Sequence, residues 1–486
     1  MQFLSACFIL PFLGLLWLLP HMPGTRGRQA LLLLFSLYFI GLATGPQNLA
    51  VMFAFVLAGY LLQRFVVART GRLATGLLAL IGVFFLLQQL TWSAFGVGAL
   101  GNAGMFGVAF MLARIIHVLV DQAQARAEDR VDALGYFTFC LSFLTFLSGP
   151  LQRQEAHQAN IRDWAPADTH ESLGGLLRFL KGVLILTLVC PLMFQAAEML
   201  LLQAAGWQQS AAGGGATALH PLPLLGAGVV LGWAAALMPL YLYANFSAYM
   251  DMVIGMGRML GLSLPENFNR PFVAVTLQEF FQRWHMTMSR WFQDYVFTPT
   301  VKKLILRWPR TEIVGYLGLV GQVVTFFAVA FWHAVDLLFL KIGLLLALFV
   351  VADRGRDLFL NRILGHARFR ELSARADYRM LIHAVSYGAI TIFVAVYVTG
   401  SGNLPAVPIS LDGGIVAMAV IVAMTSAAIV RLLLRSRPAR ALRATGLQPV
   451  SPMAKTLLIA VAIALLLLHA LQEGGDQYPG FIYARF

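Results

Sequence analysis

The chain has 486 residues, of which 59% are hydrophobic and only 12% are charged. Soluble domains carry about 25% charged residues, so the composition excludes an ordinary soluble enzyme and predicts an all-α polytopic membrane protein. The net charge of +13 would also suit a nucleic-acid-binding protein. The basic residues instead gather in loops between apolar runs, as in membrane proteins with positive cytoplasmic loops. We therefore expect membrane lipid as a partner and no nucleic acid.

The three cysteines, Cys7, Cys140 and Cys190, are scattered through apolar sequence. They fit neither a disulfide framework nor the spacing of a metal site. The sequence also lacks a phosphate-binding glycine loop and a nucleophile elbow. We therefore expect no bound metal or cofactor.

Apolar runs follow one another along the whole chain. A spanning helix needs roughly 20 such residues, so we expect about 11 to 13 transmembrane helices, with further re-entrant or interfacial helices. No lysine or arginine precedes Arg26, so the positive region of a cleavable signal peptide is missing. Arg26 and Arg28 follow the first apolar run, which predicts an external N-terminus and a cytoplasmic first loop.

The alternation of basic and uncharged loops breaks at Gly149-Pro150, where a re-entrant segment would restore it. The basic stretches 302–310 and 353–379 are both predicted to be cytoplasmic. One apolar run, Ile313–Phe331, leaves the first stretch, and another, Leu337–Val351, returns to the second, which places the turn between them, at His333, near the external face. Later spans over residues 380–470 lead to an external tail, residues 472–486. Without an internal repeat, we predict a single domain, residues 1–486, whose motif-bearing core covers about 135–352.

Residues 278–295 have the periodicity of one amphipathic helix, with His285 between its two faces and Ser289 one turn later. Arg290 and Asp294 are spaced to form an ion pair. Two interpretations stay open for His285: a hydrogen-bonded histidine of an interfacial helix, and a histidine used in chemistry. The apolar face consists of Phe281, Trp284, Met288, Trp291 and Tyr295.

His333 ends a long apolar run, directly after Trp332. A histidine at membrane depth is costly and by default indicates a functional site, and imidazole suits acid–base catalysis near neutral pH. The alternative is a side chain that reaches the interface at the end of a span. Asp336 lies three residues later, where it could orient His333 or belong only to the loop.

Three charges, Asp251, Arg258 and Glu266, lie in a glycine-rich and otherwise apolar stretch. A charge at the bilayer centre costs about 2.5–3.5 kcal/mol, so we expect this stretch to line a cavity or to lie in the interface. Pro265 and Pro271 bracket a predicted break in the helix.

Taken together, these segments resemble the membrane-bound O-acyltransferase family, and within it the bacterial branch that modifies cell-surface polymers. The order of the motifs carries the resemblance, and Gly149-Pro150 with Arg153 and the tail Phe481–Phe486 also match. The ordered motifs are Asp251, Gly255–Arg258, Pro265–Phe272, Arg283–Ser289, Trp291–Tyr295 and Phe331–His333.

The resemblance implies a ring of transmembrane helices with a cytoplasmic and an external funnel. It implies that His333 is catalytic and that His285 is a second site residue. The acyl donor would be a cytoplasmic thioester, either acetyl-coenzyme A or an acyl carrier protein thioester. A polysaccharide acceptor or a periplasmic acyltransferase or esterase-like partner would receive the group. Further candidates for donor or substrate binding are Arg283, Arg290, Asp294, Asn267, Asn269, Ser289 and Trp332.

We therefore predict a membrane-embedded O-acyltransferase of the bacterial inner membrane that transfers an acetyl group to a cell-surface polysaccharide. Carrier-fed transfer of D-alanyl or another acyl group is an alternative. Asp251–Asn269 looks more like the alginate O-acetylation proteins, whereas Arg283–Phe297 looks nearer the teichoic-acid D-alanylation proteins. Ala334 and Ala248 stand where the family usually has glycine. A polysaccharide or lipid transporter that uses the histidines as a proton relay, and a scaffold subunit, are the remaining alternatives.

Overall fold

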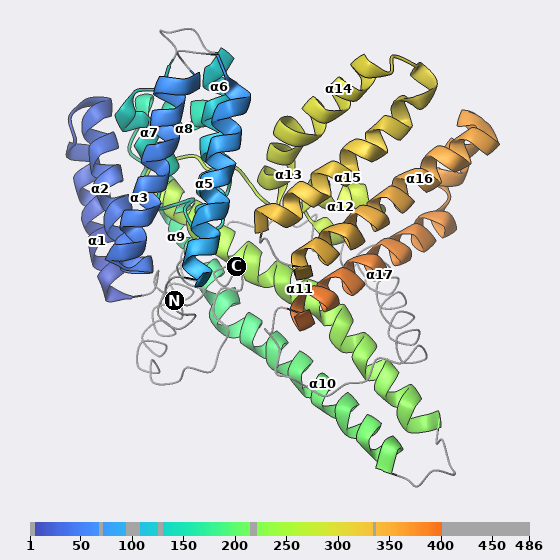
Figure 1. The fold of residues 1–486 in the computed structure, drawn as a ribbon. Coiled ribbons are helices and arrows are strands. Elements are labelled where there is room, and N and C mark those ends of the chain that lie inside the picture. The colour runs from blue at the N-terminus through green and yellow to red at the C-terminus, as the bar shows by residue number, and fades with distance from the viewer. Residues whose placement is uncertain are drawn as a thin grey trace. The chain divides into compact units, whose positions relative to one another are not determined.

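The computed structural model describes residues 5–67, 71–93, 107–124, 130–213, 221–333 and 337–400 (Figure 1). Within these ranges every regular element is a helix, so the all-α prediction is confirmed. The helices are α1 Ala6–Leu18, α2 Gly24–Thr44, α3 Pro46–Leu61, α5 Leu73–Ser93, α6 Val108–Gln124, α7 Ala133–Cys140, α8 Gln154–Arg162, α9 Thr169–Leu184, α10 Cys190–Gly213, α11 Pro221–Met259, α12 Leu277–Arg283, α13 Met286–Phe292, α14 Thr298–Arg307, α15 Val314–His333, α16 Leu337–Ala374 and α17 Ala376–Gly400.

In the part of the chain that the structure describes, five helical stretches are long and apolar enough to cross a membrane, which confirms a multi-pass membrane protein. The total of 11 to 13 spans stays a prediction, because the apolar runs 415–430 and 457–468 and the tail 472–486 lie outside the described residues. The five stretches are Gly24–Thr44, Pro46–Val67, Thr169–Ala204, Val229–Met259 and Thr311–His333.

The chain divides into two units, which are described separately. In the described residues, the first unit contains α1–α9 and residues 246–266, that is, the end of α11 and the segment after it. Its core is aromatic: the Phe35 ring of α2 packs edge-on against Phe143, with the ring centroids 4.7 Å apart. Phe8 and Phe39 join this cluster, and both side chains are fully buried.

The predicted re-entrant segment lies in this first unit. Only two short helices, α7 and α8, occur between residues 133 and 162, and a helix of eight residues is about 12 Å long. Neither helix is therefore long enough to span a membrane, and the re-entrant course of this segment stays a prediction. The buried side chain of Arg114 on α6 donates hydrogen bonds to the carbonyls of Cys140 and Thr145. This contact satisfies carbonyl groups that irregular backbone at this depth would otherwise leave without a partner.

Helices α9 and α11 approach each other closely through small residues in the first unit. A Cβ atom added to Gly175 would lie 2.7 Å from the carbonyl oxygen of Gly255, and one added to Gly255 would lie 2.6 Å from that of Gly175. Small residues allow two helix backbones to come this close, as is common inside membranes. The contact sets the spacing of the charged side chains that flank it.

The second unit contains α10, the first part of α11 and α12–α17 in the described residues. Helices α15 and α16 lie side by side, with Gly343 packed against Ala330, and α17 lies along α16 (Figure 1). The two apolar runs predicted on either side of His333 are thus confirmed as helices. Helix α16 continues beyond the predicted run to Ala374, with a kink at Gly365, whose φ is 78°.

Candidate active site

The helix is interrupted at His285, so the prediction of one continuous helix over residues 278–295 is wrong. Helix α12 ends at Arg283, and Trp284 is extended, with φ −103° and ψ 128°. His285 has a left-handed backbone, with φ 45° and ψ 51°, and α13 begins at Met286. The side chains of this stretch consequently do not share the two continuous faces that the periodicity predicts.

Residues 267–269 stabilise this interruption of the helix through backbone hydrogen bonds. The backbone N–H of Asn269 donates to the Arg283 carbonyl at 2.9 Å, and the N–H of Met286 donates to the Asn267 carbonyl at 2.9 Å. These two bonds satisfy backbone groups on both sides of His285, which a continuous helix would have satisfied internally. The bonds come from distant residues, which explains why the local pattern does not predict the break.

The His285 ring lies in the core of the second unit, where the residue is only 1% exposed. Its Nδ1 lies 3.2 Å from Oδ1 of Asn267, which is itself fully buried. Burial, and then the neighbouring His333, lower the pKa of His285. The ring is therefore neutral at physiological pH, the form that can accept a proton or a hydrogen bond.

His333 is the last described residue of α15, and two aromatic rings contact its imidazole. The ring centroid of Trp332 lies 4.7 Å from that of His333, and Phe339 of α16 stacks on the imidazole at 5.8 Å. Phe292, at the end of α13, contacts Trp332 in turn at 6.0 Å. Since His333 affects the pKa of His285, the two histidines share one electrostatic neighbourhood. Their catalytic roles stay predictions, and Asp336 and Ala334 lie outside the described residues.

The other candidate residues have different surroundings. The Arg283 guanidinium forms an ion pair with Glu279 at 2.9 Å and also donates to the Asn269 carbonyl at 3.3 Å. The Ser289 hydroxyl donates to the carbonyl of Trp284 at 3.3 Å, so it contributes to the break. Arg290 and Asp294 are both exposed, and the pairing between them stays a prediction.

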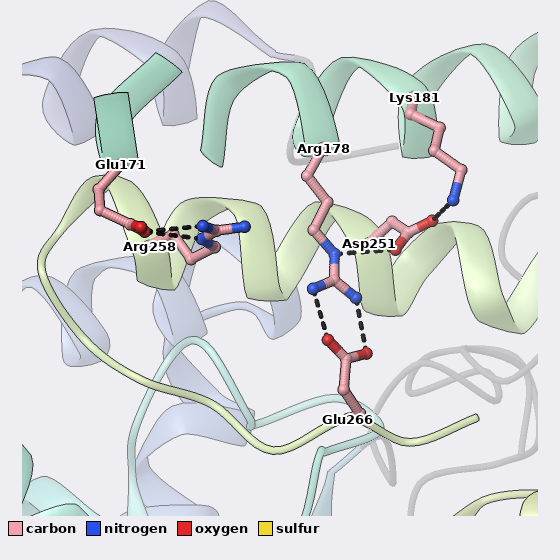
Figure 2. Close-up of polar contacts among 6 residues, drawn as sticks. All are labelled: Glu171, Arg178, Lys181, Asp251, Arg258 and Glu266. Carbon is pink, nitrogen blue, oxygen red and sulfur yellow. Dashed lines mark hydrogen bonds and ion pairs between the residues drawn. The ribbon is translucent and has the colours of Figure 1, made fainter. Parts of the chain in front are cut away.

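The three charges expected to line a cavity or lie in the interface form ion pairs in the first unit (Figure 2). Arg178 of α9 donates to Asp251 of α11 at 2.9 Å and meets Glu266 through two bonds, at 2.6 and 2.7 Å. Lys181 contacts Asp251 at 2.7 Å. Arg258 pairs likewise with Glu171 at 2.8 Å. With three positive and three negative side chains, this ion-pair cluster has no net charge.

Sequence reasoning missed the partners on α9. A signal was present, because Glu171, Arg178 and Lys181 recur at helical spacing beside Gly174, Gly175 and Gly182. That pattern of small residues flanked by charges is typical of a helix packed closely against another polar helix.

The sequence of this chain matches that of a known protein family over the region that contains these residues. The model of the membrane-bound O-acyltransferase family matches residues 116–382, which is more than half of the chain. The chain belongs to the membrane-bound O-acyltransferase family. The family prediction is thereby confirmed, and the matched residues include both histidines and all six side chains of the ion-pair cluster.

Several relatives of this family show similarity over part of their length. A teichoic acid D-alanyltransferase of Streptococcus thermophilus is 25% identical, over 49% of this chain and 54% of the relative. A probable alginate O-acetylase of Pseudomonas putida is 26% identical, over 61% of each chain. A peptidoglycan O-acetyltransferase of Helicobacter pylori is 34% identical, over 26% of this chain and 21% of the relative. The chain thus spans between about a fifth and three fifths of these relatives.

Proposed function

We propose that this protein is a membrane-embedded O-acyltransferase that takes an acyl group, most simply acetyl, from a cytoplasmic thioester. The receiving group belongs to a cell-surface polysaccharide or to a periplasmic acyltransferase partner. The observation that carries the proposal is the buried and neutral His285, held by Asn267 in the neighbourhood of His333. The family match over residues 116–382 supports it.

In the proposed reaction, His333 is the general base. Its imidazole accepts the proton of an acceptor hydroxyl while the oxygen attacks the thioester carbonyl. A carbon–oxygen bond forms, the carbon–sulfur bond breaks, and the leaving thiolate takes the proton from His333. General-base catalysis of this kind typically contributes about 10²–10⁴-fold to the rate. The aromatic rings of Trp332 and Phe339 limit the access of water to the imidazole.

The donor side would use His285 and nearby cationic groups. His285 contacts the thioester, and an arginine meets the phosphates of coenzyme A or of a phosphopantetheine arm. Glu279 already pairs with Arg283, whereas Arg290 is exposed. Arg290 is therefore the better candidate for the phosphate contact, with Asp294 to orient it.

The proposed location is the bacterial inner membrane, with both termini external. The thioester is then consumed on the cytoplasmic side, and the acyl group leaves on the external side, where His333 is predicted. A second candidate function has specific support, because the relative in Streptococcus thermophilus is named a D-alanyltransferase. In that case an acyl carrier protein would deliver the group.

The test compares wild type with His333→Gln in purified membranes supplied with labelled acetyl-coenzyme A or with a labelled acyl carrier protein. The donor that yields a covalently labelled product distinguishes the two candidate functions. His366→Gln, on the exposed part of α16, is the matched control and is expected to keep wild-type activity. Near wild-type transfer by folded His333→Gln protein would contradict the proposed base. Transport of polymer or lipid without covalent labelling would favour the transporter.

A further inference from the structure

We infer that Asn267 is a positioning residue that fixes the buried ring of His285 with its hydrogen on Nδ1 and a lone pair on Nε2. The inference rests on the proposed acyl transfer and extends it, because the tautomer decides which substrate groups His285 can bind. All atoms that carry it lie in the second unit.

The orientation of the Asn267 amide follows from its contacts with Thr287. Oδ1 of Asn267 lies 3.1 Å from the backbone nitrogen of Thr287 and 2.8 Å from its hydroxyl. A backbone N–H can only donate, so the Asn267 atom that faces it must be the carbonyl oxygen. Rotating the amide by half a turn would set its NH2 group against that N–H. The oxygen is thereby fixed as an acceptor.

The tautomer of His285 follows from the same oxygen. Nδ1 lies 3.2 Å from it, and because the oxygen only accepts, Nδ1 must carry a hydrogen. A neutral imidazole has a single ring hydrogen, so Nε2 presents its lone pair. Burial lowers the pKa of His285, which keeps the ring in this neutral form at physiological pH.

The surroundings of Asn267 hold its side chain in a fixed position beside His285. The residue is fully buried, and its carbonyl accepts the N–H of Met286 at 2.9 Å. Both its backbone and its side chain are therefore bound to the segment that begins at His285. A partner that fixes which ring nitrogen carries the proton also fixes what the other nitrogen can do.

The tautomer determines which hydrogen bonds His285 can form with a substrate. A lone pair on Nε2 cannot donate to a thioester carbonyl, so the ring does not polarise that bond. It accepts a hydrogen bond from an N–H or O–H group of a substrate. Two sources have this chemistry: the amide N–H groups of a pantetheine arm on the donor and the hydroxyl of the acceptor.

The first test reads the tautomer directly. Full-length protein labelled with [15N]histidine is placed in lipid vesicles, and solid-state NMR resolves protonated from unprotonated ring nitrogens. The His285→Gln variant identifies the signals of His285 by difference. We expect a protonated Nδ1 and an unprotonated Nε2 in wild type, in Thr287→Val, and in Asn267→Asp, which keeps an acceptor. Asn267→Leu is expected to lose this preference. A protonated Nε2 in wild type would overturn the inference.

The second test is kinetic. Asn267→Leu is expected to lower kcat/KM by about 10–100-fold. The buried Nδ1–H of His285 loses its acceptor, and nothing then fixes the tautomer of the ring. Asn267→Asp should restore a large part of this loss. With His285→Gln, a raised KM for the thioester assigns the contact to the donor arm, and a raised KM for the polymer assigns it to the hydroxyl. Activity of Asn267→Leu within about twofold of wild type would overturn the inference. A wild-type protein without acyl transfer would contradict only the proposed function, because the NMR experiment still reports the tautomer.

Discussion

Replacing Arg178 with methionine should destabilise the first unit more than any other single change in the ion-pair cluster. Methionine keeps the apolar stem of the side chain and removes the charge and all its hydrogen bonds. Arg178 donates one bond to Asp251 and two to Glu266. The two acceptors differ in exposure: the side chain of Asp251 is 11% exposed and that of Glu266 is 57% exposed.

The magnitude follows from this difference. Removing a hydrogen-bond partner from a buried charged group costs about 1.5–3 kcal/mol, and an exposed ion pair contributes about 0–1 kcal/mol. Asp251 keeps one partner, because Lys181 still contacts it. We therefore expect Arg178→Met to cost about 2–4 kcal/mol, of which the Asp251 contact accounts for the larger share. Glu266→Gln should cost about 1 kcal/mol or less.

The assay is denaturant unfolding of the protein in bicelles, followed by tryptophan fluorescence, with transfer activity as the check on folding. Lys181→Met is the matched control, because this side chain is 63% exposed and contacts the same carboxylate. It should cost about 1 kcal/mol or less. Equal losses for Glu266→Gln and Arg178→Met would refute the reasoning, since they would show that the exposed contact dominates.

Two further predictions concern the same region. Gly175→Ala should destabilise by about 1–3 kcal/mol, because its Cβ would lie 2.7 Å from the Gly255 carbonyl. Gly174→Ala, whose nearest neighbour is the Arg258 guanidinium at 3.7 Å, should be neutral or stabilising in the same unfolding assay. Hydrogen bonds from Arg178 hold the pKa of Glu266 in the folded protein below its ordinary value of 4.5. The stability that this pair contributes is therefore fully present above pH 4.5, and it is lost as the pH falls through the pKa of the folded state. The stability difference between wild type and Glu266→Gln should accordingly be largest near neutral pH and disappear in acid, and a difference that grows in acid would contradict this.

The helices of this protein are predictable where local sequence decides them. The apolar runs on either side of His333 are long, and both are helical in the described residues, as α15 and α16. The interruption around Pro265 and Pro271 was also predictable, because proline disfavours helix locally, and residues 260–270 are not helical. The helix end itself, at Met259, is followed by Gly261, whose φ is 71°. In both cases the deciding interaction lies within a few residues of the feature.

The site itself depends on contacts between distant residues, which the local pattern does not contain. Neither glycine nor proline marks the break at His285, and the aromatic periodicity continues across it. The decisive acceptor, Asn267, lies 18 residues earlier in the chain. The ion-pair partners of Asp251 are 70 or more residues away from it. Such polar pairings are set by tertiary packing, so sequence reasoning found the charged residues on α11 and missed those on α9.

Backbone strain provides a final test of how the break at His285 is held. In the described residues, the non-glycine positions with positive φ are Arg270 and His285. Arg270 directly follows the paired segment 267–269, and His285 lies within its partner segment, 283–287. A left-handed backbone costs a residue with a Cβ about 1–2 kcal/mol, whereas glycine adopts it freely. We therefore expect His285→Gly to be more stable than His285→Ala by about 0.5–1 kcal/mol, with acyl transfer lost in both. In a continuous helix the order would be reversed, because glycine there is about 1 kcal/mol less favourable than alanine. An alanine variant more stable than the glycine variant would contradict the break, and with it the tautomer argument that depends on the contact between Asn267 and His285.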